Sequence, residues 1–218
     1  MTSPPETVGL ISDVHANLPA LEAVLDDMPP VDALVHAGDV VGYGPWPNEC
    51  VELLREHDAY SILGNHDEAV FGGRVYESGN QYAKNTLTDQ NRAWLEDLPI
   101  SQTLFDGYLH VAHGHPDDKL RYTTPAEFAP DLLGAEEVLV LGHTHQQAQR
   151  EFDTGIVVNP GSVGQPRDRD KRAAYAVLDT TTSSVSLERV TYDIDRVSEK
   201  IGVTPISERN GLRLYDGR

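Results

Sequence analysis

Five short segments of the chain carry metal-binding side chains, most of them beside glycine residues. They are Asp13-Val14-His15, Gly38-Asp39, Gly64-Asn65-His66-Asp67, Ala112-His113-Gly114-His115 and Gly142-His143-Thr144-His145. Carboxylate, amide and imidazole groups together suit borderline divalent cations such as Mn, Fe or Zn, and do not resemble a thiolate-bound structural zinc site. Each segment alone could arise by chance, but the five together predict one metal centre assembled from several loops.

The spacing of these side chains favours a centre with two metal ions. Asp13 and His15 are two residues apart, so just past a strand end they can reach the same ion. A carboxylate such as Asp39 can bridge two cations by giving one oxygen to each. The remaining ligand candidates are one amide and three imidazoles: Asn65, His113, His143 and His145. A two-metal centre of this kind narrows the chemistry of the site sharply.

The first half of the chain alternates between strand and helix patterns. Residues 7–12, 33–36 and 60–63 are short apolar runs typical of buried strands, and helices are expected between them at 18–28 and 48–55. This β-α-β-α-β order predicts a parallel sheet with right-handed crossovers and ligand-binding loops at the carboxyl ends of its strands. We expect Asn17 and Asn48 to cap the two helices.

The second half is richer in strands. Residues 68–98 have a weak helical pattern, whereas strands are expected at 100–105, 108–113, 138–141, 147–152, 155–159, 173–178 and 184–190, the last four as an antiparallel set. A final helix is expected near 195–201. Two sheets packed face to face with helices outside, in a single domain over residues 1–218, fit this order.

Composition narrows the location and the partners. The 218 residues include no apolar run long enough to span a membrane, the start lacks the features of a secretory signal, and Cys50 is the only cysteine. We therefore expect a cytoplasmic protein. A net charge of −18 argues against non-specific nucleic-acid binding. Lysine is scarce while carboxylates abound, which is typical of a halophilic protein adapted to high salt.

The five segments resemble the sequence blocks of the calcineurin-like metallophosphoesterase superfamily, here ISDVH, HAGD, GNHD, AHGHP and GHTH, over about residues 7–165. The resemblance implies an α/β (α+β) fold, a four-layer αββα sandwich of two mixed β-sheets flanked by helices. It also implies that Asp13, His15, Asp39 and His145 hold one metal, and that Asp39 bridges to a second held by Asn65, His113 and His143. His66 would not bind metal but would face the scissile phosphate.

The expected mechanism is in-line attack on phosphorus by a metal-bridging hydroxide, with His66 assisting the leaving group. Mn is the favoured metal, with Fe, Zn, Ni or Co as alternatives. We expect Asp67 to cap a helix rather than orient His66. Tyr43 and Arg167 are candidate contacts to a small phosphorylated substrate, of which a nucleotide is one example.

Other blocks, GDVVGYGPWPNEC, RAWLEDLP and NPGSVGQPRD, are similar to a group of small prokaryotic predicted phosphodiesterases related to diadenosine tetraphosphatase. Phosphoprotein phosphatases continue as Asp-Arg-Gly where this chain has Gly42-Tyr43-Gly44, which argues against their substrates. A phosphodiester is favoured because no cluster of arginines is visible for a dianionic phosphate. The alternatives are a phosphomonoesterase or nucleotide phosphatase, or a catalytically silent scaffold of the same fold. A homodimer is compatible with the sequence.

Overall fold

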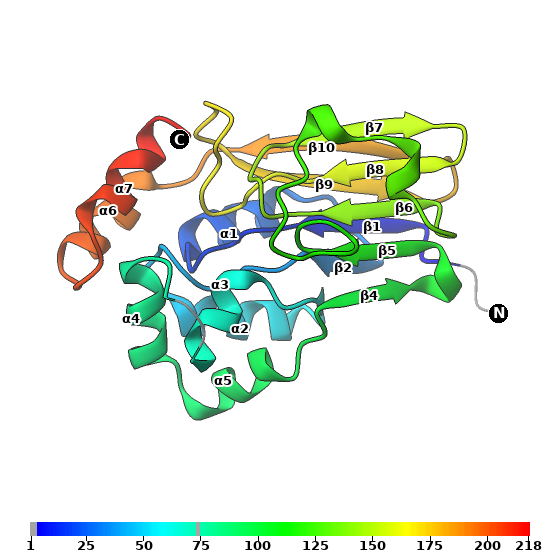
Figure 1. Ribbon diagram of the computed structural model, residues 1–218. Helices are drawn as coiled ribbons and strands as arrows, with labels where there is room; N and C mark the ends of the chain where they lie inside the picture. Colours follow the sequence, from blue (N-terminus) through cyan, green and yellow to red (C-terminus); the bar gives the residue numbers. More distant parts are fainter. Residues whose placement is uncertain (1–3, 73–74) are drawn as a thin grey trace.

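Two five-stranded sheets pack face to face in the computed structural model, which describes residues 4–72 and 75–218 (Figure 1). The first sheet has the order β10-β9-β1-β2-β3 and the second the order β4-β5-β6-β8-β7. The strands are β1 Thr7–Ile11, β2 Ala33–His36, β3 Tyr60–Ser61, β4 Ser101–Leu104, β5 Leu109–Ala112, β6 Val138–Leu141, β7 Ala148–Phe152, β8 Gly155–Asn159, β9 Ala173–Asp179 and β10 Ser184–Val190. The helices are α1 Leu18–Asp27, α2 Pro47–Glu56, α3 Asn65–Glu68, α4 Ser78–Thr86, α5 Asp89–Glu96, α6 Ile194–Gly202 and α7 Glu208–Leu212.

Both sheets are mixed. Strands β1, β2 and β3 are parallel, and β9 pairs antiparallel with β1 and with β10. In the second sheet β5, β6 and β8 are parallel, while the edge strands β4 and β7 are antiparallel to their neighbours. The four late strands expected as one antiparallel set are therefore two antiparallel pairs, one in each sheet, because β8 also pairs with β6 and β9 with β1.

Apolar side chains on alternating strand positions form the core between the sheets. On β1, Val8 and Leu10 point into this core, where they meet residues such as Val111 of β5 and Val140 of β6. The four side chains are fully buried. Removal of each from water contributes about 1.5–3 kcal/mol to folding. One face of β1 is thus fixed toward the second sheet.

Helices cover the outer face of the first sheet. Buried residues of α1, α2, α5 and α6, including Leu21, Leu54, Leu95 and Val197, form one cluster there. The outer face of the second sheet is covered by the segment 113–137, from which Phe128 packs on Leu139 and Leu141. This segment contains the short 3₁₀ turns Pro125–Glu127 and Pro130–Leu132. The expected class, two mixed sheets with flanking helices, is confirmed.

The two predicted helix caps have different outcomes. Asn17 caps α1 as expected, because its side chain accepts a hydrogen bond from the Ala20 amide at 3.3 Å. Asn48 does not cap α2, which begins one residue earlier, at Pro47. Instead Asn48 accepts from the Thr88 amide and donates to the Thr86 carbonyl, so it holds α2 against the junction between α4 and α5.

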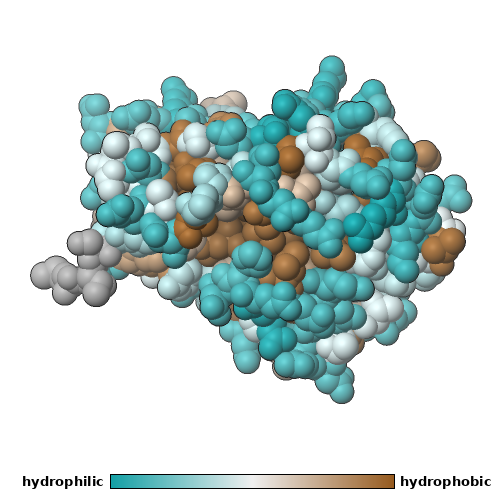
Figure 2. Space-filling view, turned by 180° about the vertical axis from the view of Figure 1, so that it is seen from behind, coloured by the Kyte–Doolittle hydropathy of each residue, from teal (hydrophilic) through white to brown (hydrophobic). Residues whose placement is uncertain are grey.

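Hydrophilic residues dominate the surface, with a hydrophobic band across the middle of the face in Figure 2. None of the described helices combines the length and apolar character that crossing a membrane requires.

Candidate metal centre

The candidate ligands lie at the edge where the parallel strands of both sheets end (Figure 1). Asp13 follows β1, Asp39 follows β2, His113 follows β5 and His143 follows β6, while Asn65 begins α3 after β3. Parallel strands end at the same edge of a sheet, which brings residues far apart in sequence together. The face-to-face packing of the sheets then sets the loops of one sheet against those of the other.

Six of the seven expected ligands form two buried groups, one of Asp13, His15 and His145 and the other of Asp39, His113 and His143. Within each group the candidate ligand atoms lie within 4.8 Å of one another. The seventh, Asn65, joins the second group, because its Oδ1 is 3.1 Å from Nε2 of His113. All seven residues are nearly or completely buried.

Backbone carbonyls orient three of the imidazoles. The Nδ1 atoms of His15, His113 and His145 lie 3.1, 2.8 and 2.5 Å from the carbonyl oxygens of Val41, Ala37 and Gln165, respectively. A carbonyl only accepts, so each Nδ1 carries the proton and each Nε2 is left with a lone pair directed into the site. This outward hydrogen bond is the usual support of a metal-binding histidine.

Each of the two carboxylates uses one oxygen for the protein and leaves the other unpaired. Asp13 Oδ2 accepts from the Ser12 hydroxyl at 2.7 Å and from the His143 amide at 3.0 Å, and Asp39 Oδ1 accepts from the His66 amide at 2.8 Å. The other oxygens, Asp13 Oδ1 and Asp39 Oδ2, are buried without a hydrogen-bond partner, as is Nε2 of His143. Buried unpaired acceptors are costly and rare unless a cation meets them.

Asp39 lies between the two groups. Its Oδ2 is 3.3 Å from Nε2 of His113 and 3.8 Å from Nε2 of His15. The sequence suggested a bridge with one oxygen for each cation. Oδ1 accepts from the His66 amide, and Oδ2 is the oxygen that faces both groups without a hydrogen-bond partner.

The electrostatics of the site favour positive charge. Burial alone would raise the pKa of Asp39 and Asp13, but neighbouring imidazoles, chiefly His113 and His145, hold both values below the usual range. Burial opposes a charge on His113, but Asp39 and Asp13 outweigh it and raise its pKa to about 9. Burial and the adjacent His145 instead keep the pKa of His15 well below its usual value. Without a metal ion, a proton is thus drawn to the second group.

Backbone strain is concentrated on the candidate ligands. Asp13, His15, Asp39, His143 and His145 have positive φ angles between 50° and 64°, a region that costs non-glycine residues about 1 kcal/mol or more each. Neighbouring glycines permit close loop packing: a Cβ on Gly64 would lie 2.1 Å from Oδ1 of Asp39. Such strain persists because the surrounding hydrogen bonds fix the ligand geometry.

His66 lies beside the metal ligands. Its ring centroid is 4.9 Å from that of His15, 4.7 Å from that of Tyr43 and 5.2 Å from that of Tyr76. Burial is the main cause that lowers its pKa. A neutral imidazole within this aromatic cluster can exchange a proton or hydrogen bond with a bound group.

Asp67 supports the loops rather than His66. Its carboxylate accepts from the amides of Gly64, Asp39 and Val41 at 2.9–3.0 Å, so it caps α3 and also ties the Asp39 loop to it. These contacts agree with the expectation that Asp67 caps a helix and does not orient His66. Farther along the chain, Ser162 donates to the Asp13 carbonyl and Asn159 donates to the Gly142 carbonyl. These two side chains therefore also hold the loops that carry the candidate ligands.

Tyr43 and Arg167, the candidate substrate contacts, adjoin each other and the site. Nη2 of Arg167 donates to the Tyr43 hydroxyl at 3.1 Å, and the Tyr43 ring packs edge-on against His15 at 4.7 Å. Folding also brings Arg213 to the same ring, although no arginine cluster was visible in the sequence. That part of the argument for a diester was therefore wrong.

Sequence reasoning missed two aromatic residues at the site. Tyr76 packs against His66, and Tyr122 stacks on His143 with ring centroids 4.1 Å apart. Both are about half exposed, at 42% and 54%. No local pattern marks them, because each reaches the site from a loop whose path depends on the whole fold.

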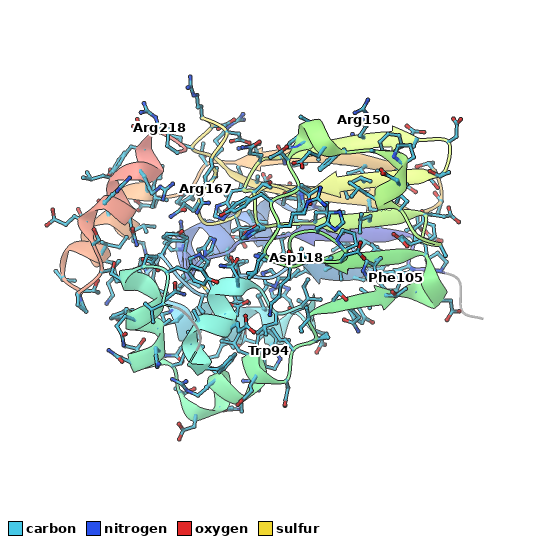
Figure 3. The ribbon with its side chains drawn as sticks, viewed as in Figure 1. Trp94, Phe105, Asp118, Arg150, Arg167 and Arg218 are labelled. Carbon is cyan, nitrogen blue, oxygen red and sulfur yellow. The ribbon has the colours of Figure 1, made fainter. Side chains whose placement is uncertain are left out.

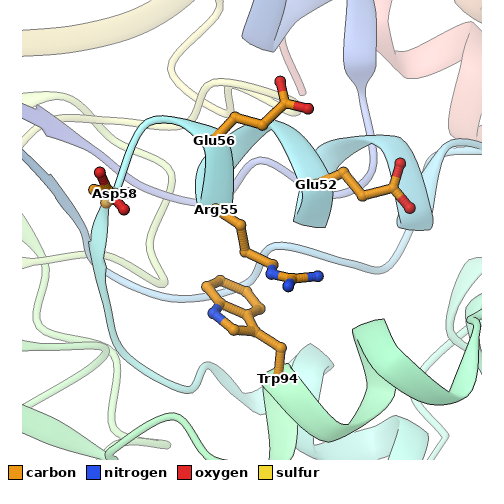
Figure 4. Close-up of a pocket in the computed structure, with 6 residues that line it drawn as sticks. Glu52, Arg55, Glu56, Asp58 and Trp94 are labelled. Carbon is orange, nitrogen blue, oxygen red and sulfur yellow. The ribbon is translucent and has the colours of Figure 1, made fainter.

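A separate hollow of about 640 Å³ lies between α2 and α5, with Trp94 and Arg55 among its lining residues (Figure 4). Three carboxylates, Glu52, Glu56 and Asp58, also line it. None of the candidate metal ligands does, so the hollow is distinct from the metal centre.

Known proteins resemble this chain over most of its length. The family model described as the calcineurin-like phosphoesterase superfamily domain matches residues 7–183. The uncharacterized protein MJ0912 of Methanocaldococcus jannaschii is 32% identical, covering 97% of this chain and 98% of that protein. Phosphodiesterase YfcE of Escherichia coli K12 is 31% identical, covering 80% and 88%. A crystal structure of a metallophosphoesterase from Sphaerobacter thermophilus has a TM-score of 0.88 at 32% identity, covering 99% and 100%.

Proposed function

The chain belongs to the calcineurin-like phosphoesterase superfamily and is a metal-dependent phosphoester hydrolase, and we propose that it is a phosphodiesterase with a two-metal centre. In this proposal Asp13, His15, Asp39 and His145 hold one cation. Asp39, Asn65, His113 and His143 hold the other. The preference for diesters is supported by the relatives named phosphodiesterases, YfcE and MJ0936.

One observation carries the proposal. Nε2 of His15 lies 3.1 Å from Nε2 of His145, and both Nδ1 atoms already face backbone carbonyls. Two lone pairs at this distance repel each other, and Asp13 Oδ1, 3.3 Å from His145, adds negative charge. A cation between these atoms converts the repulsion into coordination, so the donor set fits a metal ion.

When bound, the two ions supply an activated water and neutralise the charge of the phosphoryl group. The chain's own residues position the ligands and assist the leaving group. Asp67 and the backbone carbonyls hold the ligands rigid, and His66 is proposed to give a proton or hydrogen bond to the oxygen of the leaving group. The lowered pKa of His66 leaves its imidazole neutral in the free protein, and a neutral imidazole can donate a hydrogen bond. To give a proton, His66 would have to be protonated when substrate binds, and the negative charge of the phosphate raises its pKa in that direction.

Hydrolysis of bis-p-nitrophenyl phosphate with Mn²⁺ tests the proposal directly, with p-nitrophenyl phosphate as the monoester control. We expect faster release of nitrophenol from the diester, and none after Asp39→Asn. Faster turnover of the monoester would favour a phosphomonoesterase. No turnover with Mn²⁺, Fe²⁺, Zn²⁺, Ni²⁺ or Co²⁺ at low or high salt would favour a catalytically silent scaffold. The same proposal includes four further points: manganese as the bound metal, a cytoplasmic location, a homodimer, and a single domain over residues 1–218.

A further inference from the structure

The C-terminal part of the chain packs beside the metal centre. Helices α6 and α7 follow the segment that matches the family model, which ends at residue 183, and lie near the loop edge of the sheets (Figure 1). Buried Val197, Ile201 and Leu214 attach them to the core. Asn210 of α7 donates to the Tyr43 carbonyl at 3.1 Å and to the Glu77 carboxylate at 2.8 Å. The C-terminal helices therefore hold the loop that contacts His15 and His66.

Two guanidinium groups converge on Tyr43 from different parts of the chain. Arg167 lies between the C-terminal helices and the strand ends, as labelled in Figure 3, and its Cζ is 5.5 Å from the centroid of the Tyr43 ring. Cζ of Arg213, which follows α7, is 5.9 Å from the same centroid. Because that ring is 4.7 Å from the rings of both His15 and His66, the two arginines flank the proposed reaction site.

Neither arginine forms an ion pair with an aspartate or glutamate side chain among the described residues, although Nε of Arg213 donates to the main-chain oxygen of Arg218. Other arginines do: Arg172 pairs with Asp170 at 2.6 Å and Arg196 with Glu22 at 3.0 Å. Glu77 exerts an attraction on Arg213, but it forms no ion pair with it, and its oxygens accept from Tyr43, Gly79, Asn80 and Asn210. The two guanidiniums repel each other, and the repulsion of Arg213 by Arg167 is larger than the attraction of Arg213 to Glu77.

Gln165 connects this pair to the metal centre. Its side-chain oxygen accepts from Nε and Nη2 of Arg167 at 3.2 and 2.8 Å, and its backbone oxygen faces Nδ1 of His145. Gln165 is 1% exposed, and its Nε2 is a buried donor with no partner among the described residues. A buried, unsatisfied donor next to the Arg167 guanidinium indicates a place for an anion.

We propose that Arg167 and Arg213 form a phosphate subsite beside the metal centre, so that the preferred substrate is a phosphodiester carrying a second, monoester phosphate group. The inference rests on the proposed function and specifies its substrate class. Guanidinium groups bind phosphate oxygens through paired, charge-assisted hydrogen bonds, and two of them match the double charge of a phosphate monoester. The Tyr43 ring, which both guanidiniums approach, is 4.7 Å from the His66 ring.

Two chromogenic diesters separate this subsite from the reaction itself. Thymidine 5′-(p-nitrophenyl phosphate) and its 3′-phosphorylated derivative contain the same scissile bond and differ by one phosphate group. We expect the Mn²⁺-loaded wild-type protein to have the higher kcat/KM for the 3′-phosphorylated compound. Arg213→Gln should reduce that preference by about 10- to 100-fold, the range expected for lost charge-assisted bonds, and leave the simple diester nearly unchanged.

Arg172→Gln is the matched control, since it makes the same charge change at an arginine paired with Asp170. It should retain the wild-type preference. An equal loss on both diesters after Arg213→Gln, or no loss on either, would overturn the phosphate subsite.

Calorimetric binding separates failure of the subsite from failure of the proposed function. Thymidine 3′,5′-bisphosphate should bind wild-type protein more tightly than thymidine 5′-monophosphate, and Arg213→Gln should abolish the difference. If the wild type hydrolyses neither diester but shows this binding pattern, the subsite stands and the proposed activity falls. Equal affinity of wild type and Arg213→Gln for the bisphosphate would remove the subsite whatever the activity.

Discussion

Substitution of Asp39 by Asn removes a negative charge from between the two groups of candidate ligands and keeps the shape of the side chain. Its Oδ1 can still accept from the His66 amide, and the new Nδ2 can donate to Nε2 of His113, which is 3.3 Å from the present Oδ2. The metal-free variant loses the attraction between Asp39 and His113 but keeps these hydrogen bonds, so its stability should fall by about 1–3 kcal/mol, the size of one lost partner of a buried polar pair. Metal binding should weaken strongly, because an amide nitrogen is a poor metal ligand in place of Oδ2, the carboxylate oxygen that the proposal assigns to the cations.

The size of the effect follows from binding linkage. A metal present at about 100 times its Kd stabilises the folded state by about 2.7 kcal/mol, and at a concentration equal to Kd by about 0.4 kcal/mol. For a chain of this length, each kcal/mol raises Tm by about 2–4 °C. If Asp39→Asn weakens binding about 100-fold, a rise of about 5–11 °C in the wild type becomes a rise of about 1–2 °C.

Thermal unfolding of chelator-treated protein, with and without added Mn²⁺, measures both parts of this prediction. Asp117→Asn is the control, since it removes the same charge from a side chain that is 94% exposed in the loop after His115. It should retain the full metal-dependent rise. The reasoning is refuted if Asp39→Asn keeps more than half of the wild-type rise, or if its metal-free form loses more than about 3 kcal/mol of stability.

Three other outcomes are expected. His66→Ala should retain metal content but lower kcat by about 10²- to 10⁴-fold, and an unchanged kcat would remove His66 from the mechanism. Gly64→Ala should destabilise the protein by about 1–3 kcal/mol in denaturant unfolding, because the added Cβ would lie 2.1 Å from Asp39 Oδ1. Gly202→Ala is the control, because a Cβ at Gly202 meets no atom within 4 Å. The free energy of unfolding should rise with KCl concentration because salt screens a net charge of −18, and equal stability in dilute buffer would contradict the halophilic prediction.

Much of the fold could be predicted because hydrophobic patterns record which local segments are buried. Strands β2, β6, β8 and β10 have the predicted bounds, and α1 and α6 differ from the prediction by one or two residues at an end. Their apolar side chains recur with the period of a strand or a helix, and those periods are local properties. The sheet to which each late strand belongs is not local, which is why β7–β8 and β9–β10 were not assigned to separate sheets.

The chemical types of the candidate ligands and their positions at strand ends, from Asp13 to His145, can be read from the chain alone, because side-chain identity and strand boundaries are local properties. Which atoms face the centre depends on folding: carbonyls of Val41, Ala37 and Gln165 orient the imidazoles, and the His66 amide occupies one oxygen of Asp39. Folding alone also brought Arg213 to Arg167. Such contacts join residues that are far apart in the chain, as His15 and His145 are at 130 positions, and chain folding, not local pattern, creates them.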